Sequence, residues 1–118
     1  MWGDAKWHQR QKEEEDRRAE IDAEQWERGS KLEALLRTAE TDIDAGRLVE
    51  LARLLFPQDF KMREEGLERV RNMRMEPRGN DPAFQDIIRT HERVARLSIE
   101  FAISKARAVM TLVESWKK

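Results

Sequence analysis

Apolar residues in the last third of the chain recur at helical spacing over an unusually long stretch. Pro82 can occupy the first helical position, capped by Asn80 or Asp81, because the N–H that proline lacks has no helical partner there. Neither proline nor glycine occurs from Ala83 to the C-terminus. The pattern predicts one long helix over residues 82–117, which would span about 54 Å.

Two rows of apolar positions lie on this predicted helix. The first repeats in steps of seven, or of four and three, as in a helix supercoiled against another helix. It comprises Ile88, Ala95, Ile99, Ala102, Ala106, Val109, Val113 and Trp116. The second row lies about 100° around the helix and comprises Phe84, Ile87, His91, Val94, Ser98, Phe101, Ala108 and Leu112. Because each row needs a partner, we expect an inner member of a bundle of three or more helices.

The first row has two interpretations. It can lie in the core of a single chain, where its alanines allow a neighbouring helix to approach closely. It can also be a self-association seam between copies of the chain. The residues of this candidate seam are Ile88, Ala95, Ile99, Ala102, Ala106, Val109 and Val113.

Shorter apolar patterns predict three more helices upstream. Ser30 and Glu33 have the spacing of a capping box, which would open the first of them, and Gly46 would end it. The alternative is that this helix continues from the first arm through a kink at Gly29. Pro57 would help to end the second helix, and Asp59 could cap the third. The predicted ranges are 31–45, 47–56 and about 60–75.

The loop at residues 76–80 contains proline, glycine and asparagine, and it should join the third helix to the last one as an antiparallel hairpin. The expected fold class is therefore all-α, a helical bundle built on this hairpin with a long C-terminal helix. Residues 1–28 are almost entirely polar and predict a helical arm that is loosely held. We divide the chain into this arm and a bundle domain over residues 29–118.

Four tryptophans stand out as candidate partner-binding residues: Trp2, Trp7, Trp26 and Trp116. Tryptophan is enriched at the centres of binding surfaces, because its large apolar ring is costly to leave in water. The first two would then anchor an interaction arm. The alternative is that they fix the arm onto the protein's own bundle.

Composition agrees with a helical chain of one domain. The 118 residues are 40% charged and 39% hydrophobic, with only five glycines and three prolines, which is typical of long helices and coiled coils. The absence of cysteine excludes disulfides, thiol nucleophiles and thiolate metal sites, and it fits a reducing, cytoplasmic location. Neither a secretory signal nor a membrane span is expected from the sequence.

The residues needed for catalysis are scarce. The two histidines, His8 and His91, have no companion at the spacing of a helical metal site, and the carboxylates lie among basic residues on polar faces. His91 is better explained as a partly buried, hydrogen-bonded side chain. We expect no enzymatic activity, no cofactor and no metal site.

Arginines cluster around the predicted hairpin and form a candidate phosphate-binding patch: Arg69, Arg71, Arg74, Arg78, Arg89, Arg93 and Arg96. Such a cluster can follow a nucleic-acid backbone without reading its sequence. Acidic residues lie among the arginines, and the net charge is −1, so that pairing within the protein is the competing explanation. The leading hypothesis is a helical adaptor or assembly subunit that self-associates or docks on a larger protein, and backbone binding is the alternative.

Overall fold

The structure is a computed structural model that describes the fold of residues 2–117 and the side chains of residues 5–117. It confirms the all-α class, and no strand occurs within these residues. The helices are α1 (Trp2–Thr38), α2 (Ile43–Leu55), α3 (Pro57–Arg74), α4 (Pro82–Leu97) and α5 (Glu100–Trp116), with a short 3-10 helix η1 (Pro77–Asn80) between α3 and α4.

The first helix does not break where the sequence predicted a capping box. α1 continues through Gly29 and Ser30 as one helix, so the predicted start of a new helix at residue 31 is wrong. Gly29 is buried against α4, and a Cβ built on it would lie 3.2 Å from the Cβ of Arg96. This glycine serves close helix packing, which the sequence pattern alone does not reveal.

The break lies further along the chain. α1 ends at Thr38, and α2 begins at Ile43, where the carboxylate of Asp42 accepts a hydrogen bond of 2.8 Å from the backbone N–H of Ala45. The predicted boundary at Gly46 is therefore wrong. At the other end of α2, Phe56 alone separates it from α3, and Pro57 is the first residue of α3.

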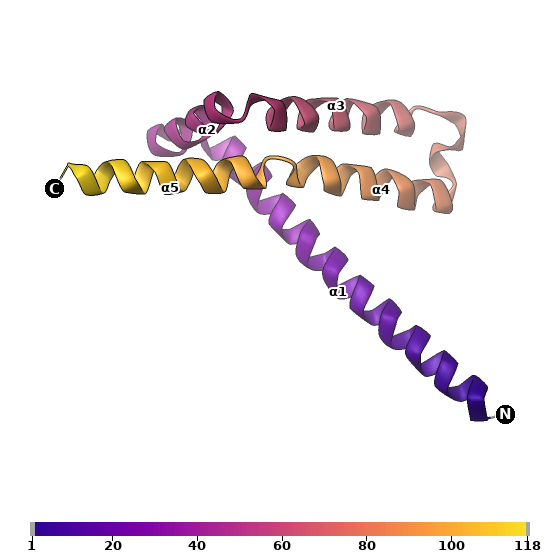
Figure 1. Ribbon diagram of the computed structural model, residues 1–118. Helices are drawn as coiled ribbons and strands as arrows, with labels where there is room; N and C mark the ends of the chain where they lie inside the picture. The colour runs from indigo at the N-terminus through magenta and orange to yellow at the C-terminus, as the bar shows by residue number, and fades with distance from the viewer. Residues whose placement is uncertain (1, 118) are drawn as a thin grey trace.

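The predicted antiparallel hairpin is confirmed: α3 and α4 run side by side and are joined through η1 (Figure 1). Their close approach depends on Gly66, because a Cβ placed there would lie only 2.8 Å from the Cβ of Ala95. Beyond this contact, Val70, Phe84 and Ile88 form a small buried cluster near the loop. The hairpin on which the sequence predicts the bundle to be built thus holds the smaller apolar cluster, and a larger one lies elsewhere.

The last third of the chain is helical throughout its length except at one place. A turn at Ser98–Ile99 separates α4 from α5, so the single uninterrupted helix predicted over residues 82–117 is interrupted there. The hydroxyl of Ser98 donates a hydrogen bond of 2.6 Å to the carbonyl of Ala95, which competes with the helical ladder. The two helices still lie roughly end to end (Figure 1).

The main core lies where α2 packs on α5 and the end of α1. Ala52, Ala102 and Ala106 are completely buried, and these small residues let the helices approach closely. The other buried members are Leu32, Leu48, Val49, Phe60, Ile99 and Ile103.

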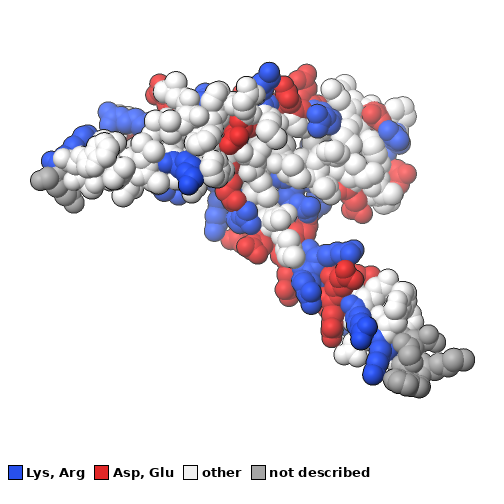
Figure 2. Space-filling model, viewed as in Figure 1, with Lys and Arg blue, Asp and Glu red and all other residues white. Residues whose placement is uncertain are grey.

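The molecule is elongated. It measures 69 × 39 × 22 Å with a radius of gyration of 19.3 Å, whereas a compact domain of this length has about 13.5 Å. The accessible surface is 9221 Å², against about 6,700 Å² for a compact monomer of the same mass. Much of the difference comes from α1, whose N-terminal half projects away from the other helices with charges of both signs along it (Figures 1 and 2).

Candidate protein-interaction surfaces

The middle of α1 is attached to α4 and α3 by ion pairs, and the end of the helix packs in the main core through Leu32. Asp22 pairs with Arg93 and, at 3.3 Å, with Arg89 of α4. Glu33 pairs with Arg63 of α3 at 2.7 Å, and both side chains are largely shielded from water. A polar helix can therefore be positioned here without a large apolar stripe, which explains why α1 is so poor in apolar residues.

Trp26 reinforces this attachment. Two guanidinium groups of α4 lie over its ring, with the carbon of Arg89 at 4.5 Å and that of Arg96 at 4.9 Å from the ring centre. Trp26 thus contacts the protein's own bundle. Trp7 and Trp116 are largely exposed, at 59% and 72% of their surface, and the side chain of Trp2 lies outside the described residues.

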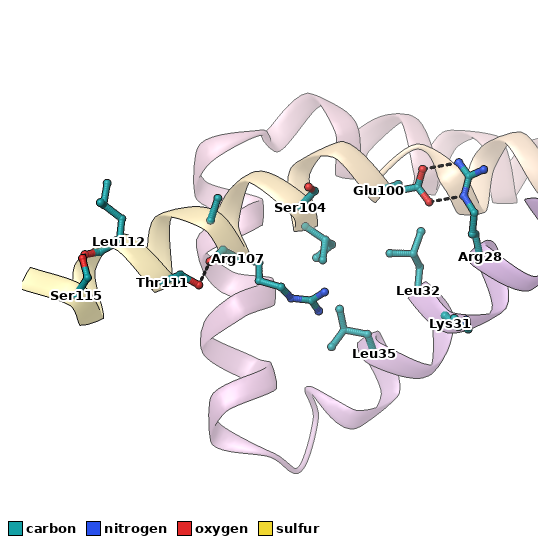
Figure 3. A pocket seen from close by; sticks show the side chains of 12 residues that line it. Arg28, Lys31, Leu32, Leu35, Glu100, Ser104, Arg107, Thr111, Leu112 and Ser115 are labelled. Atoms are coloured by element: carbon teal, nitrogen blue, oxygen red, sulfur yellow. Dashed lines mark hydrogen bonds and ion pairs between the residues drawn. The ribbon is translucent and has the colours of Figure 1, made fainter.

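An open groove of about 700 Å³ runs between α1 and α5 (Figure 3). Its floor is apolar, formed by Leu32 and Leu35 of α1 and by Ile103 of α5, and Arg107 extends from α5 toward Leu35. None of these four residues was singled out from the sequence as a candidate site residue. The groove forms because two helices far apart in sequence diverge, and no local pattern records that angle.

The groove is closed at one end by an ion pair between Arg28 and Glu100. The guanidinium donates two hydrogen bonds, of 2.8 Å from Nε to Oε2 and of 2.5 Å from a terminal nitrogen to Oε1 (Figure 3). These hydrogen bonds hold the pKa of Glu100 below its ordinary value and raise the pKa of Arg28. The pair fixes the vertex at which α1 and α5 diverge.

The candidate self-association seam is used mostly within one chain. Its buried members are Ile88, Ala95, Ile99, Ala102 and Ala106. Val109 and Val113, at the end of α5, remain 39% and 38% exposed. The first row therefore explains the core of the single chain, and only its last members are available to another molecule.

Three of the most apolar residues of the second row are exposed, whereas most of the first row is buried. Ile87, Val94 and Phe101 are 49%, 59% and 55% exposed and follow one another at intervals of seven residues. We call these three residues the outer row. Phe84 at the start of the second row is buried, and Leu112 at its end is half exposed in the groove beside α1.

The ionic residues of α4 all lie away from the outer row. They recur at helical spacing on the side that faces α1 and the end of α3, and they comprise Asp86, Arg89, Glu92, Arg93 and Arg96. The side bearing Ile87 and Val94 is completed by Ala83, Thr90 and His91. An exposed helix side without Asp, Glu, Lys or Arg is unusual, because charged residues are depleted only where a surface is covered.

Five of the seven arginines in the candidate phosphate-binding patch are engaged with carboxylates. Arg74 and Arg96 share the buried Glu92, with contacts of 2.7 and 2.8 Å, and Arg78 pairs with Glu76 at 2.9 Å. Arg89 and Arg93 hold Asp22, as described above. Within the described part of the chain, no ion pair of Arg69 or Arg71 is found.

His91 is half buried in a shallow groove between α3 and α4, beside Met62 and Val94. Among the residues whose side chains are described, no three His, Asp or Glu residues come together as a metal site would require. Within the same residues, no helix has an apolar stretch long enough to cross a membrane.

Comparison with protein-family models, with curated proteins and with solved structures finds no match. The groove, the outer row and the arginine patch are therefore the features that bear on function.

Proposed function

We propose that the protein is a non-enzymatic helical adaptor or assembly subunit, which self-associates or docks on a larger protein. The observation that supports this most strongly is the outer row. Ile87, Val94 and Phe101 expose about half of their surface, and the side of α4 that bears Ile87 and Val94 carries no Asp, Glu, Lys or Arg. On α5, the ammonium of Lys105 lies 5.3 Å from the centre of the Phe101 ring. A side chain arrangement of this kind is stabilised when a second helix covers it.

The size of the exposed surface agrees with this proposal. The chain exposes about 2,500 Å² more than a compact monomer of its mass. A stable protein interface of standard size takes about 800 Å² from each partner. The excess is thus larger than one partner's share of a standard interface, although the projecting α1 accounts for much of it.

Sequence-independent binding to a nucleic-acid backbone is a weaker proposal. Each arginine that is already paired with a carboxylate must give up that contact before it can bind a phosphate. The pairing of Arg74, Arg89, Arg93 and Arg96 with Asp22 and Glu92 therefore reduces the charge available. Arg69 and Arg71 would have to supply most of the binding.

The test is the absolute molar mass of the purified chain by light scattering, at low and at near-physiological salt, together with the absorbance ratio that reports nucleic acid. A particle heavier than 14.0 kDa, unchanged by salt and free of nucleic acid, would support assembly. A monomer that carries nucleic acid only at low salt would support the arginine patch.

A cytoplasmic location, which a chain without cysteine suits, belongs to the same proposal.

A further inference from the structure

The outer row lies on an exposed side of the α3–α4 hairpin, away from α1. α1 packs against the opposite side of α4, through Trp26, Gly29 and Asp22. Met62 of α3, which is 59% exposed, lies beside Val94 in a shallow groove, and Glu65 and Arg69 of α3 line the same groove. An additional helix would complete the packing of α4 on this side.

We propose that this helix is α4 of a second copy of the chain, which packs antiparallel against the first around a two-fold axis at Val94. This inference rests on the proposed function and names the partner and the register. Most soluble oligomers are homo-oligomers, and a two-fold interface must bring one surface against itself. The outer row meets this requirement.

The spacing of the outer row is symmetric about its central residue. Ile87 lies seven residues before Val94 on α4, and Phe101 lies seven residues after it on α5, beyond the turn at Ser98–Ile99. In an antiparallel pair centred there, Val94 would contact the partner's Val94, and Ile87 would contact the partner's Phe101. At four residues on either side lie Thr90 and Ser98, whose small side chains allow the helices to approach closely.

Phe101 is suited to be the aromatic anchor of this contact. Its ring packs edge-on against Phe56, at 5.2 Å between ring centres, so that it is held in place before a partner arrives. An ordered aromatic residue loses little conformational entropy on binding. It would lie over the smaller Ile87 of the second copy.

Charge favours this register over the next one. Lys105 is the nearest ionic residue along the row, one turn beyond Phe101. With Val94 at the centre, Lys105 lies beside the start of the partner's α4, where Asp81 is the capping residue. A shift that placed Val94 against Phe101 would instead bring Lys105 over Thr90, in the middle of the apolar contact, at a cost in desolvation.

The absence of cysteine makes a direct test simple, because a single introduced thiol is the only one present. Val94→Cys should form a disulfide-linked dimer rapidly under mild oxidation, since the two thiols would face each other across the axis. Ile87→Cys and Phe101→Cys should cross-link when the two variants are mixed, and much less when either is alone. Asn72→Cys, which is exposed on α3, is the control and should form no disulfide-linked dimer.

The outcomes separate the register from the proposed function. Rapid cross-linking of Val94→Cys with a silent Asn72→Cys control supports the inference. A mixture of Val94→Cys and Phe101→Cys that cross-links faster than Val94→Cys alone would overturn the register. A wild-type chain heavier than 14.0 kDa with no cross-link at Val94 would overturn the interface while self-association stands, whereas a monomer at every concentration would overturn self-association itself.

Discussion

Small residues occur in this protein where two helices must approach each other closely. Gly66 is the clearest example. A glycine inside a helix normally costs about 1 kcal/mol of stability relative to alanine, so that the sequence alone marks Gly66 as a weak point of α3. The structure gives a different reason, because a Cβ at this position would lie 2.8 Å from that of Ala95.

Gly66→Ala should therefore destabilise the protein, by about 1 kcal/mol, despite the better helix propensity of alanine. The measurement is the free energy of unfolding in urea. The matched control is the double variant Gly66→Ala with Ala95→Gly, in which the methyl group changes sides. The two substitutions together should cost at least about 1 kcal/mol less than the sum of their separate effects. Simple additivity would show that the two helices do not meet at this point.

The ion pair between Glu100 and Arg28, at the vertex of α1 and α5, makes the stability of the protein depend on pH. The pKa of its carboxyl is lowered in the folded state by the hydrogen bonds from Arg28. The stability that this ion pair contributes should be complete above the unfolded pKa of about 4.3 and lost as the pH falls through the folded pKa, while the arginine stays charged throughout.

Glu100→Gln should consequently lower the melting temperature near neutral pH, and the difference from wild type should narrow as the pH falls below about 4. Thermal unfolding between pH 7 and pH 3 measures this. Glu24→Gln, at an exposed carboxylate that lies 3.9 Å from the same arginine, is a suitable control and should have a smaller effect. A difference that widens in acid would contradict the assigned pairing.

At the scale of elements, α1 combines an attached half with a projecting half. All described side chains from residue 5 to residue 21 are exposed, and the contacts with α4 begin at Asp22. The boundary drawn from the sequence at residue 28 falls inside this helix, after Asp22 and Trp26 have already made contact with the bundle.

Removing residues 1–19 should leave the melting temperature of the bundle within about 2 °C of the full chain, because every described side chain of that segment, from residue 5 on, is exposed. Removing residues 1–28 should lower it by about 5 °C or more, since Asp22, Trp26 and Arg28 go with it. Differential scanning calorimetry compares the two truncations. An equal loss in both would mean that the projecting half stabilises the bundle.

The sequence was informative about elements that have a local cause. The hairpin could be predicted because the loop at residues 76–80 and Pro82 punctuate a clear helical pattern, and the two apolar rows could be read directly. The continuation of α1 through Gly29 could not be predicted, since it depends on how Gly29 packs on Arg96 of α4. The breaks at residues 39–42 and at Ser98–Ile99 contain neither glycine nor proline, so no local signal marks them.

Among the candidate surfaces, too, only the features with a local cause could be predicted from the sequence. That the second row needed a partner was a prediction from spacing. The ion pairs that join α1 to the bundle involve residues 30 to 72 positions apart, such as Glu33 with Arg63 and Arg28 with Glu100. Such pairs leave no periodic signal, so the groove between α1 and α5 could only be found in three dimensions.

At the scale of the whole molecule, the chain buries most of the first row by itself and leaves the outer row exposed for a second copy. Sedimentation of the wild type and of Val94→Glu over a range of concentrations tests this most directly. The wild type should approach twice 14.0 kDa as concentration rises, and its melting temperature should rise with it. Val94→Glu should remain at 14.0 kDa and melt independently of concentration, with a dimer weakened by about 30-fold or more.

Asn72→Glu, with the same added charge on an exposed position of α3, should dimerise like the wild type. A wild-type chain that stays at 14.0 kDa at every concentration, or a Val94→Glu variant that dimerises as well as the wild type, would contradict the claim.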